Sequence, residues 1–219
     1  MGGSFYDLEP RTVKRLGNRF SLEISEGRFD AKNEDFFQID TNALDKVDLV
    51  ISCMVMEHFS DDLEDRFMQR ASELLRDSGL MVGFVPSSPA HWGIEDDIAG
   101  HCRRYTRESM LELAGKNGWT IRHIAGLTYP ISNILLPVSN FLVRRAEETK
   151  LAMSNIEKTK ASGIRDVRFK TTFPNVLALF LNEYILLPLH WLQKIFSYSR
   201  RSLVLYFEAA PQKLTIRGE

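Results

Sequence analysis

The polar run HWGIEDDIAGHCRRYT, residues 91–106, combines histidine, carboxylate and arginine side chains. Histidine titrates near neutral pH, so His101 can act as a general base that takes a proton from a reacting hydroxyl. The guanidinium of Arg103 can hold a phosphate or a carboxylate through two parallel hydrogen bonds. The alternative is structural, with the arginines paired to the acidic residues of the same run, and we prefer it for Arg104. His101 and Arg103 are the candidate catalytic residues, with both interpretations open.

Carboxylates also occur in two segments that have the composition of short strands. Glu23 lies in RFSLEIS, and Asp40 ends DFFQID. Ligands of α/β sheets bind at the carboxyl ends of the strands, so Glu23 can accept hydrogen bonds from ribose hydroxyls and Asp40 from an adenine amine. Each carboxylate alone can equally cap a helix or lie in a solvated loop. Only the pair, at successive strand ends, favours a site for a nucleoside.

The stretch DLVISCMVMEHFSDDLEDRFMQRASELLRDSGLMVGFVP, residues 48–86, predicts a strand, a helix and a second strand. Residues 49–52 form a short, apolar run that suits a buried parallel strand. Asp61 and Glu64 can cap a helix, and apolar residues then recur at helical spacing. Gly79 is expected to end this helix. Strand, crossover helix and strand make the βαβ unit of a parallel sheet.

Similar elements lie on both sides of this unit. RFSLEIS and DFFQID are expected to be earlier strands. A helix capped by Thr106 (TRESMLELAGKNG), a strand (WTIRHIAGL) and a last strand (RSLVLYFEAA) follow. The pattern predicts an α/β fold, with a doubly wound sheet.

The ordered segments DLVISCMVMEHF, ELLRDSGLMVGFVPSS and GHCRRYTRESMLELAGKNGW resemble class I S-adenosylmethionine-dependent methyltransferases, in particular small-molecule and glycan-cluster members. The resemblance covers about residues 20–130 and the last strand. It implies a Rossmann-like methyltransferase sheet and S-adenosyl-L-methionine as the cofactor. Cys53, Met54 and Val55 would face the methionine part of the cofactor, with His58 nearby.

The resemblance also bears on whether a metal ion binds at Glu57 and His58. Some quinone-pathway relatives have a Glu-x-x-Glu-His metal site here, but Met54 occupies the first Glu position, so no metal is expected. Glu57 and His58 can alternatively start the following helix and orient its loop.

The segment MGGSFYD departs from the family pattern. Family members begin with a strand and a glycine-rich loop, where the missing Cβ lets the backbone approach the cofactor. Gly2 and Gly3 are expected to be the last part of that loop, without the strand before it. The resemblance therefore implies an N-terminally truncated sheet, either because the start is placed too late or because this is a trimmed member with impaired cofactor binding.

Composition narrows the class of protein. With 219 residues, 44% of them hydrophobic and 26% charged, the chain suits one methyltransferase-like domain over residues 1–219. A net charge of −1 gives no reason to expect a nucleic-acid partner. Cys53 and Cys102 are too few for a disulfide framework, and no apolar leader opens the chain, so a cytoplasmic protein is expected.

Residues 129–198 are expected to be a helical, apolar insertion before the last strand. The part from 173 to 196 is dense in apolar and aromatic residues, but Asn182, Glu183 and Pro188 interrupt it, so it is not expected to span a membrane. Two alternatives stay open for this part. It is a core-packing or homodimer surface, or it contacts the inner membrane face peripherally.

Together these observations favour methyl transfer to a hydroxyl or carboxyl oxygen of a glycan, glycolipid or lipid-linked small molecule. The alternative is a catalytically silent, methyltransferase-like subunit that binds a partner through its apolar insertion. The incomplete glycine loop favours that alternative, whereas Glu23, Asp40 and His101 favour the enzyme.

Overall fold

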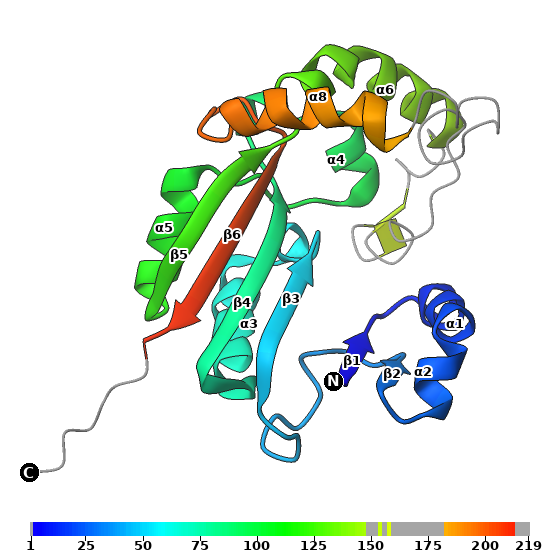
Figure 1. The fold of residues 1–219 in the computed structure, drawn as a ribbon, viewed down its shortest axis with the longest axis vertical. Helices are drawn as coiled ribbons and strands as arrows, with labels where there is room; N and C mark the ends of the chain where they lie inside the picture. Colours follow the sequence, from blue (N-terminus) through cyan, green and yellow to red (C-terminus); the bar gives the residue numbers. More distant parts are fainter. Residues whose placement is uncertain (1, 148–152, 155–156, 159–181, 213–219) are drawn as a thin grey trace, which may run out of the picture.

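The computed structural model describes residues 2–147, 153–154, 157–158 and 182–212, which form an α/β fold (Figure 1). The elements in chain order are β1 (Gly3–Tyr6), α1 (Pro10–Arg19), α2 (Ser21–Ser25), β2 (Phe29–Lys32), β3 (Val47–Cys53), η1 (Met56–His58), α3 (Asp61–Leu74), β4 (Leu75–Pro86), η2 (Pro89–His91), α4 (Ile94–Ala99), α5 (Arg107–Lys116), β5 (Trp119–Leu127), α6 (Ile131–Glu147), α8 (Glu183–Ile195) and β6 (Val204–Pro211).

The strands form two sheets. The larger sheet has the order β3-β4-β6-β5, in which β3 is parallel to β4 and β6 is antiparallel to both of its neighbours. The smaller sheet is the parallel pair of β1 and β2. The parallel pairs, and the crossover helix α3 between β3 and β4, confirm the Rossmann-like α/β class.

The main core lies between the larger sheet and the helices α3 and α5. Side chains of α3 (Phe67, Met68) and of α5 (Met110) pack with Phe207 of β6 in one buried cluster. Gly83 of β4 pairs with Phe207, and a Cβ at Gly83 would lie 2.1 Å from the phenyl ring. Glycine is required there because the aromatic ring occupies the space of a side chain.

Strand β3 is parallel to β4 as expected, but the prediction that its apolar residues are buried is only partly right. Ser52 is buried, whereas Leu49 and Ile51 are 42% and 64% exposed. Leu49 and Ile51 lie on the same face of β3, and the described residues leave that face largely uncovered.

The prediction of a strand at RFSLEIS was wrong, because residues 21–25 form the helix α2. The apolar residues of RFSLEIS alternate as in a strand, but Leu16, Phe20 and Ile24 also recur at the four-residue spacing of a helix. Phe20 packs on Phe29 at the start of β2, with ring centroids 4.9 Å apart. This contact favours the helical spacing.

The prediction of a strand at DFFQID was also wrong, since residues 36–38 form a turn. Asp35 Oδ1 accepts a hydrogen bond from Phe37 N at 2.9 Å, which closes the turn. Phe36 and Phe37 then pack against Phe67 and Phe59, respectively. Two adjacent aromatic residues thus contact the core from a turn.

The segment MGGSFYD contains the strand β1, not the remainder of a glycine-rich loop. Gly3 begins β1 and pairs with Phe29, and Gly2 precedes it with Arg28 O 3.1 Å from the position of a Cβ. Helix α3 also differs from its prediction, because it ends at Leu74 and not at Gly79, which lies within β4.

The helix after Thr106 and the last two strands form as predicted. Helix α5 has Thr106 as its N-cap, with Thr106 Oγ1 accepting from Ser109 N at 3.0 Å. Strands β5 and β6 form as expected, and helices α6 and α8 lie between them in the chain. Residues 173–181 of the predicted apolar segment lie outside the described residues.

Candidate functional site

A cavity of about 1010 Å³ lies at the carboxyl ends of β1, β3 and β4. Its volume is at the upper end of the range of small-molecule sites. Most of the lining comes from five parts of the chain: residues 6–8 at the end of β1, residues 34–37 after β2, the end of β3 and the segment after it (Cys53, Met54, Val55, Glu57, His58 and Phe59), the α4 region (Glu95, Asp96, Ala99, His101 and Arg104), and α6 (Ser132, Leu135, Leu136 and Ser139). Leu63, Pro86, Thr128, Leu203 and Val204 complete it. The site is therefore where α/β sheets hold ligands.

One wall of the cavity carries the carboxylate that follows β1. Asp7 Oδ1 accepts a hydrogen bond from Glu9 N at 2.7 Å, and burial raises the pKa of Asp7. Asn33, which directly follows β2, donates through Nδ2 to Asp7 O at 2.9 Å. Glu34 and Asp35 line the same wall. The two strand ends thus carry acidic groups side by side.

The structure does not bring Glu23 or Asp40 to this cavity. Glu23 lies in α2 and Asp40 in an exposed loop, where Asp40 Oδ1 accepts from Asn42 N at 2.9 Å. Neither Gly2 nor Gly3 lines the cavity. The expectation that acidic residues follow the first strands survives at other positions, because β1 and β2 lie elsewhere in the chain than predicted.

The structure does place Cys53, Met54, Val55 and His58 at the cavity. Met54 has a left-handed backbone, with φ 52°, and its N donates to Phe84 O at 2.8 Å. The chain therefore turns sharply at the end of β3, and the residues after it face the cavity.

Helix α4 positions His101. Asp96 Oδ2 accepts from Gly93 N at 2.8 Å before the helix, and Gly100 ends the helix in the left-handed region, with φ 73°. His101 N then donates to Asp96 O at 3.0 Å. A glycine is favoured at this helix end because a side chain at positive φ is strained. The short helix thus places His101 beside Asp96.

The Asp96 carboxylate is fully buried and holds the imidazole. Asp96 Oδ1 lies 2.8 Å from His101 Nδ1 and accepts from Arg104 Nε at 2.8 Å. Burial alone would raise the pKa of Asp96, but the hydrogen bonds from His101, Arg104 and Gly93 lower it to about 2. A carboxylate at Nδ1 keeps the proton on that nitrogen, so the lone pair of His101 lies on Nε2.

Glu57 is the most unusual group of the site. Its side chain is 0% exposed, and neither carboxylate oxygen has a hydrogen-bond partner among the described residues. Burial raises the pKa of Glu57 to about 8, and the nearby Asp96 charge adds to this effect. His58 follows it, and burial together with the neighbouring His101 lowers the pKa of His58 to about 4. At neutral pH, Glu57 is therefore mostly protonated and His58 neutral.

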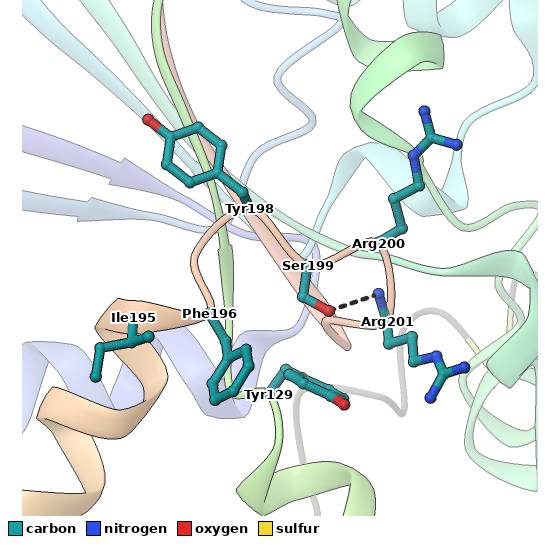
Figure 2. A pocket seen from close by; sticks show the side chains of 7 residues that line it. All are labelled: Tyr129, Ile195, Phe196, Tyr198, Ser199, Arg200 and Arg201. Carbon is teal, nitrogen blue, oxygen red and sulfur yellow. Dashed lines mark hydrogen bonds between the residues drawn. The ribbon is translucent and has the colours of Figure 1, made fainter.

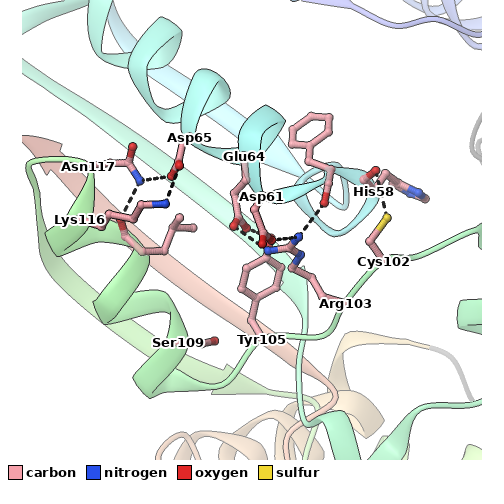
Figure 3. A network of polar contacts seen from close by, with 12 residues as sticks. His58, Asp61, Glu64, Asp65, Cys102, Arg103, Tyr105, Ser109, Lys116 and Asn117 are labelled. Carbon is pink, nitrogen blue, oxygen red and sulfur yellow. Dashed lines mark hydrogen bonds and ion pairs between the residues drawn. The ribbon is translucent and has the colours of Figure 1, made fainter.

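Arg103 belongs to a different network (Figure 3). Its guanidinium donates to Asp61 Oδ1 at 2.6 Å, to Glu64 Oε2 at 2.9 Å and to Phe59 O at 3.0 Å. Tyr105 also donates its hydroxyl to Glu64. Arg103 does not line the cavity, whereas Arg104 does. The geometry gives no support for Arg103 as the clamp of an anionic substrate.

A second hollow, of about 510 Å³, lies where α8 ends (Figure 2). Tyr129 and Phe196 pack there with ring centroids 5.4 Å apart, and Ser199 Oγ accepts from Arg201 N at 3.2 Å. Arg200 is paired with Glu108 at 2.7 Å. Among the described residues, its lining contains no carboxylate and no histidine.

The helices between β5 and β6 expose large apolar side chains. Ile134, Val138 and Phe141 share one face of α6, while Tyr184, Trp191 and Ile195 are exposed on α8. Among the described residues, no helix has the length and the apolar run that crossing a bilayer requires.

Comparison with solved structures shows a shared fold. The O-methyltransferase NcsB1 of neocarzinostatin biosynthesis, in complex with S-adenosyl-L-homocysteine and 1,4-dihydroxy-2-naphthoic acid, is 18% identical, with 57% of this chain covered and a TM-score of 0.45. The [4+2]-cyclase SpnF is 10% identical, with 96% of this chain and 67% of that chain covered and a TM-score of 0.53. At 10% identity, the similarity to SpnF shows a shared fold and no more. This chain spans 38% of the length of NcsB1.

The two sequence comparisons gave different results. A search of curated proteins found no match. A family model described as a methyltransferase domain matches residues 4–124, which is more than half of the chain. The matched range contains β1 to β4 and the residues of the α4 region that border the cavity. The chain belongs to this family of methyltransferase domains.

Proposed function

We propose that this protein is an S-adenosylmethionine-dependent O-methyltransferase for a small-molecule acceptor. The observation that supports this function best is the composition of one cavity. Acidic residues at the ends of β1 and β2 form one wall, and His101, oriented by Asp96, lies on another. A nucleoside-containing cofactor and an acceptor that must lose a proton need these two kinds of group.

The carboxylates of the first wall can accept hydrogen bonds from the cofactor. Asp7 is proposed to accept hydrogen bonds from the ribose hydroxyls, in place of Glu23, because it directly follows β1. Asp35, or its neighbour Glu34, is proposed at the adenine, in place of Asp40. Cys53, Met54 and Val55 are proposed to contact the methionine part, as the family resemblance implies. When bound, the cofactor would supply an electrophilic methyl group on a sulfonium.

His101 is proposed as the general base. His101 lines the cavity and its Nε2 carries the lone pair, so it can take the proton of an acceptor hydroxyl that would receive the methyl group. The cofactor would supply the methyl group and leave as the neutral thioether, and the proton would stay on His101. Asp96 stabilises the imidazolium that results. Arg103 is proposed to hold the loop of His101, not the substrate.

The apolar wall bears on the acceptor class. Leu135 and Leu136 of α6, together with Phe37, add apolar side chains to the lining of the cavity. They support an acceptor with an apolar part, such as a lipid-linked intermediate or a glycolipid, over a free glycan. The exposed apolar faces of α6 and α8 support contact with a partner copy or with the inner membrane face, in a cytoplasmic protein.

The alternative is a methyltransferase-like subunit without activity. One solved neighbour is a [4+2]-cyclase, so the fold does not by itself imply methyl transfer. The alternative also draws on the unpaired edge of β3 and the exposed apolar helices, which suit a protein-binding role.

Calorimetric titration with S-adenosyl-L-homocysteine tests the cofactor site. Asp7→Asn is expected to weaken binding about 5- to 150-fold, because a lost buried polar contact costs about 1–3 kcal/mol. Asp40→Asn is the matched control, since Asp40 is exposed and lies outside the cavity. No heat with the folded wild-type chain would contradict the enzyme. Equal effects of the two substitutions would contradict the assignment of Asp7.

A further inference from the structure

Three side chains that can bind a metal converge at one corner of the cavity. Glu57, His58 and His101 each offer one ligand atom, and these atoms lie within 4.8 Å of one another. Glu57 and His58 come from η1 at the end of β3, whereas His101 follows α4. The sequence alone does not show this grouping, because two distant segments contribute to it.

The Glu57 carboxyl group is the independent sign of a missing partner. It is 0% exposed, and in the part of the chain that the structure describes neither of its oxygens has a hydrogen bond. The other two buried carboxylates among the described residues are well paired, Glu64 with Arg103 and Asp96 with Arg104. A buried carboxyl without partners is costly, and a bound cation removes that cost.

The imidazole of His101 is held as metal-bound histidines are held. Asp96 Oδ1 fixes Nδ1 at 2.8 Å, and Nε2 lies 3.8 Å from Glu57 Oε1. Metal-binding histidines usually direct one nitrogen to the metal and the other to a carboxylate. Here Arg104 in turn fixes the carboxylate of Asp96. The ring of His58 lies 4.9 Å from that of His101, so both imidazoles reach the same space.

We infer that Glu57, His58 and His101 form a binding site for a divalent transition-metal cation such as Zn²⁺. Two imidazoles and one carboxylate are a ligand set that such cations favour, with further positions open to the cavity. Bonds of about 2.0–2.1 Å in a tetrahedral site require ligand atoms about 3.4 Å apart, so the side chains must approach by about 1 Å on binding. Met54 does not prevent the site, because His101 supplies the third ligand.

The site has a consequence for the proposed function, and this consequence rests on that function. A cation on His101 Nε2 occupies the lone pair that would accept the proton of the acceptor. The bound cation is therefore expected to inhibit methyl transfer, and a chelator is expected to restore it. Activation by the cation would refute His101 as the base but leave the metal site intact.

Binding is tested directly with Co²⁺ and Zn²⁺ on the full chain, without a histidine tag. The wild type is expected to bind one Co²⁺, seen as visible ligand-field absorption, and Zn²⁺ is expected to displace it. Glu57→Gln, His58→Gln and His101→Gln should each weaken Zn²⁺ binding at least tenfold by calorimetry. Far-ultraviolet circular dichroism confirms that each variant is folded.

Two controls separate this site from other ligands. His123→Gln removes a histidine of β5 that lies outside the cavity, and Cys53→Ser removes the thiol next to the site. Both are expected to bind Zn²⁺ as the wild type does. A wild type that binds neither cation, or a loss of binding only in Cys53→Ser, would overturn the inference. The result is independent of whether S-adenosyl-L-homocysteine binds.

Discussion

Replacing Glu57 by glutamine tests whether a carboxyl group is buried without a partner. Glutamine has nearly the same shape and cannot ionise. In the folded protein, burial raises the pKa of Glu57 from 4.5 to about 8, so the wild type must either hold a proton or bury a charge. Between pH 4.5 and 8 the folded state therefore binds more protons at this position than the unfolded state. Wild-type stability is expected to fall as the pH rises through this range.

The magnitude follows from the size of the shift. One pKa unit corresponds to about 1.4 kcal/mol, so stability should fall by about 1.4 kcal/mol per pH unit and by about 4 kcal/mol between pH 5 and 8. His58 opposes this trend below pH 6.5, because its pKa is lowered from 6.5 to about 4 and its contribution to stability rises with pH there. The wild-type curve should therefore be nearly flat below pH 6.5 and fall by about 2 kcal/mol between pH 6.5 and 8.

Urea unfolding at pH 5, 6, 7 and 8, with a chelator present, measures the difference between wild type and Glu57→Gln. Since Asp96, His101, His58 and Cys53 surround Glu57 in both proteins, the difference isolates the ionisation of Glu57. The variant is expected to gain about 4 kcal/mol on the wild type from pH 5 to pH 8. Glu112→Gln, at an exposed position of α5, should show no such gain. A difference that does not change with pH would refute the burial of an unpaired carboxyl group.

Other substitutions test the core and the proposed base. Gly83→Ala places a Cβ 2.1 Å from the Phe207 ring, so it should lower the free energy of unfolding by about 1–3 kcal/mol, whereas Gly115→Ala, with no atom within 4 Å of the new Cβ, should be neutral or stabilising. Equal denaturant midpoints for the two variants would contradict this. His101→Ala should lower turnover and leave the affinity for S-adenosyl-L-homocysteine nearly unchanged; the reverse result would make His101 a binding residue. Asp96→Asn should lower kcat and change the pH–rate profile, since Asp96 sets the protonated nitrogen of His101, and an unchanged profile would limit Asp96 to a structural role.

The sequence predicts the larger sheet well, and the reason is the clarity of its patterns. Residues 119–127 and 204–211 are long, apolar strands, and Thr106 caps its helix as expected. By contrast, β1 and β2 have four residues each, GSFY and FDAK, and neither contains an apolar run. Neighbouring segments have stronger strand patterns, so the sequence places the candidate cofactor carboxylates at Glu23 and Asp40 and overlooks Asp7, the residue that follows β1.

The site was predictable only where residue type is enough. His101 is a candidate general base on residue type alone, because histidine titrates near neutral pH. Asp96 and Arg104 were expected to pair within the loop, and they do. Their contact with His101 depends on the short helix α4 and on Gly100. The isolation of Glu57 depends on complete burial, which a single sequence does not reveal.

Arg103 joins the two segments that carry the candidate metal ligands. Its guanidinium bonds the start of α3 and the carbonyl of Phe59, and its neighbour Cys102 donates from N to Glu57 O at 2.7 Å. The backbone amides of these segments are therefore expected to exchange with solvent deuterium together, through one shared opening, and not independently. A ligand that needs Glu57 and His101 to move apart must pay for this opening, whereas one that enters beside β1 leaves these bonds intact.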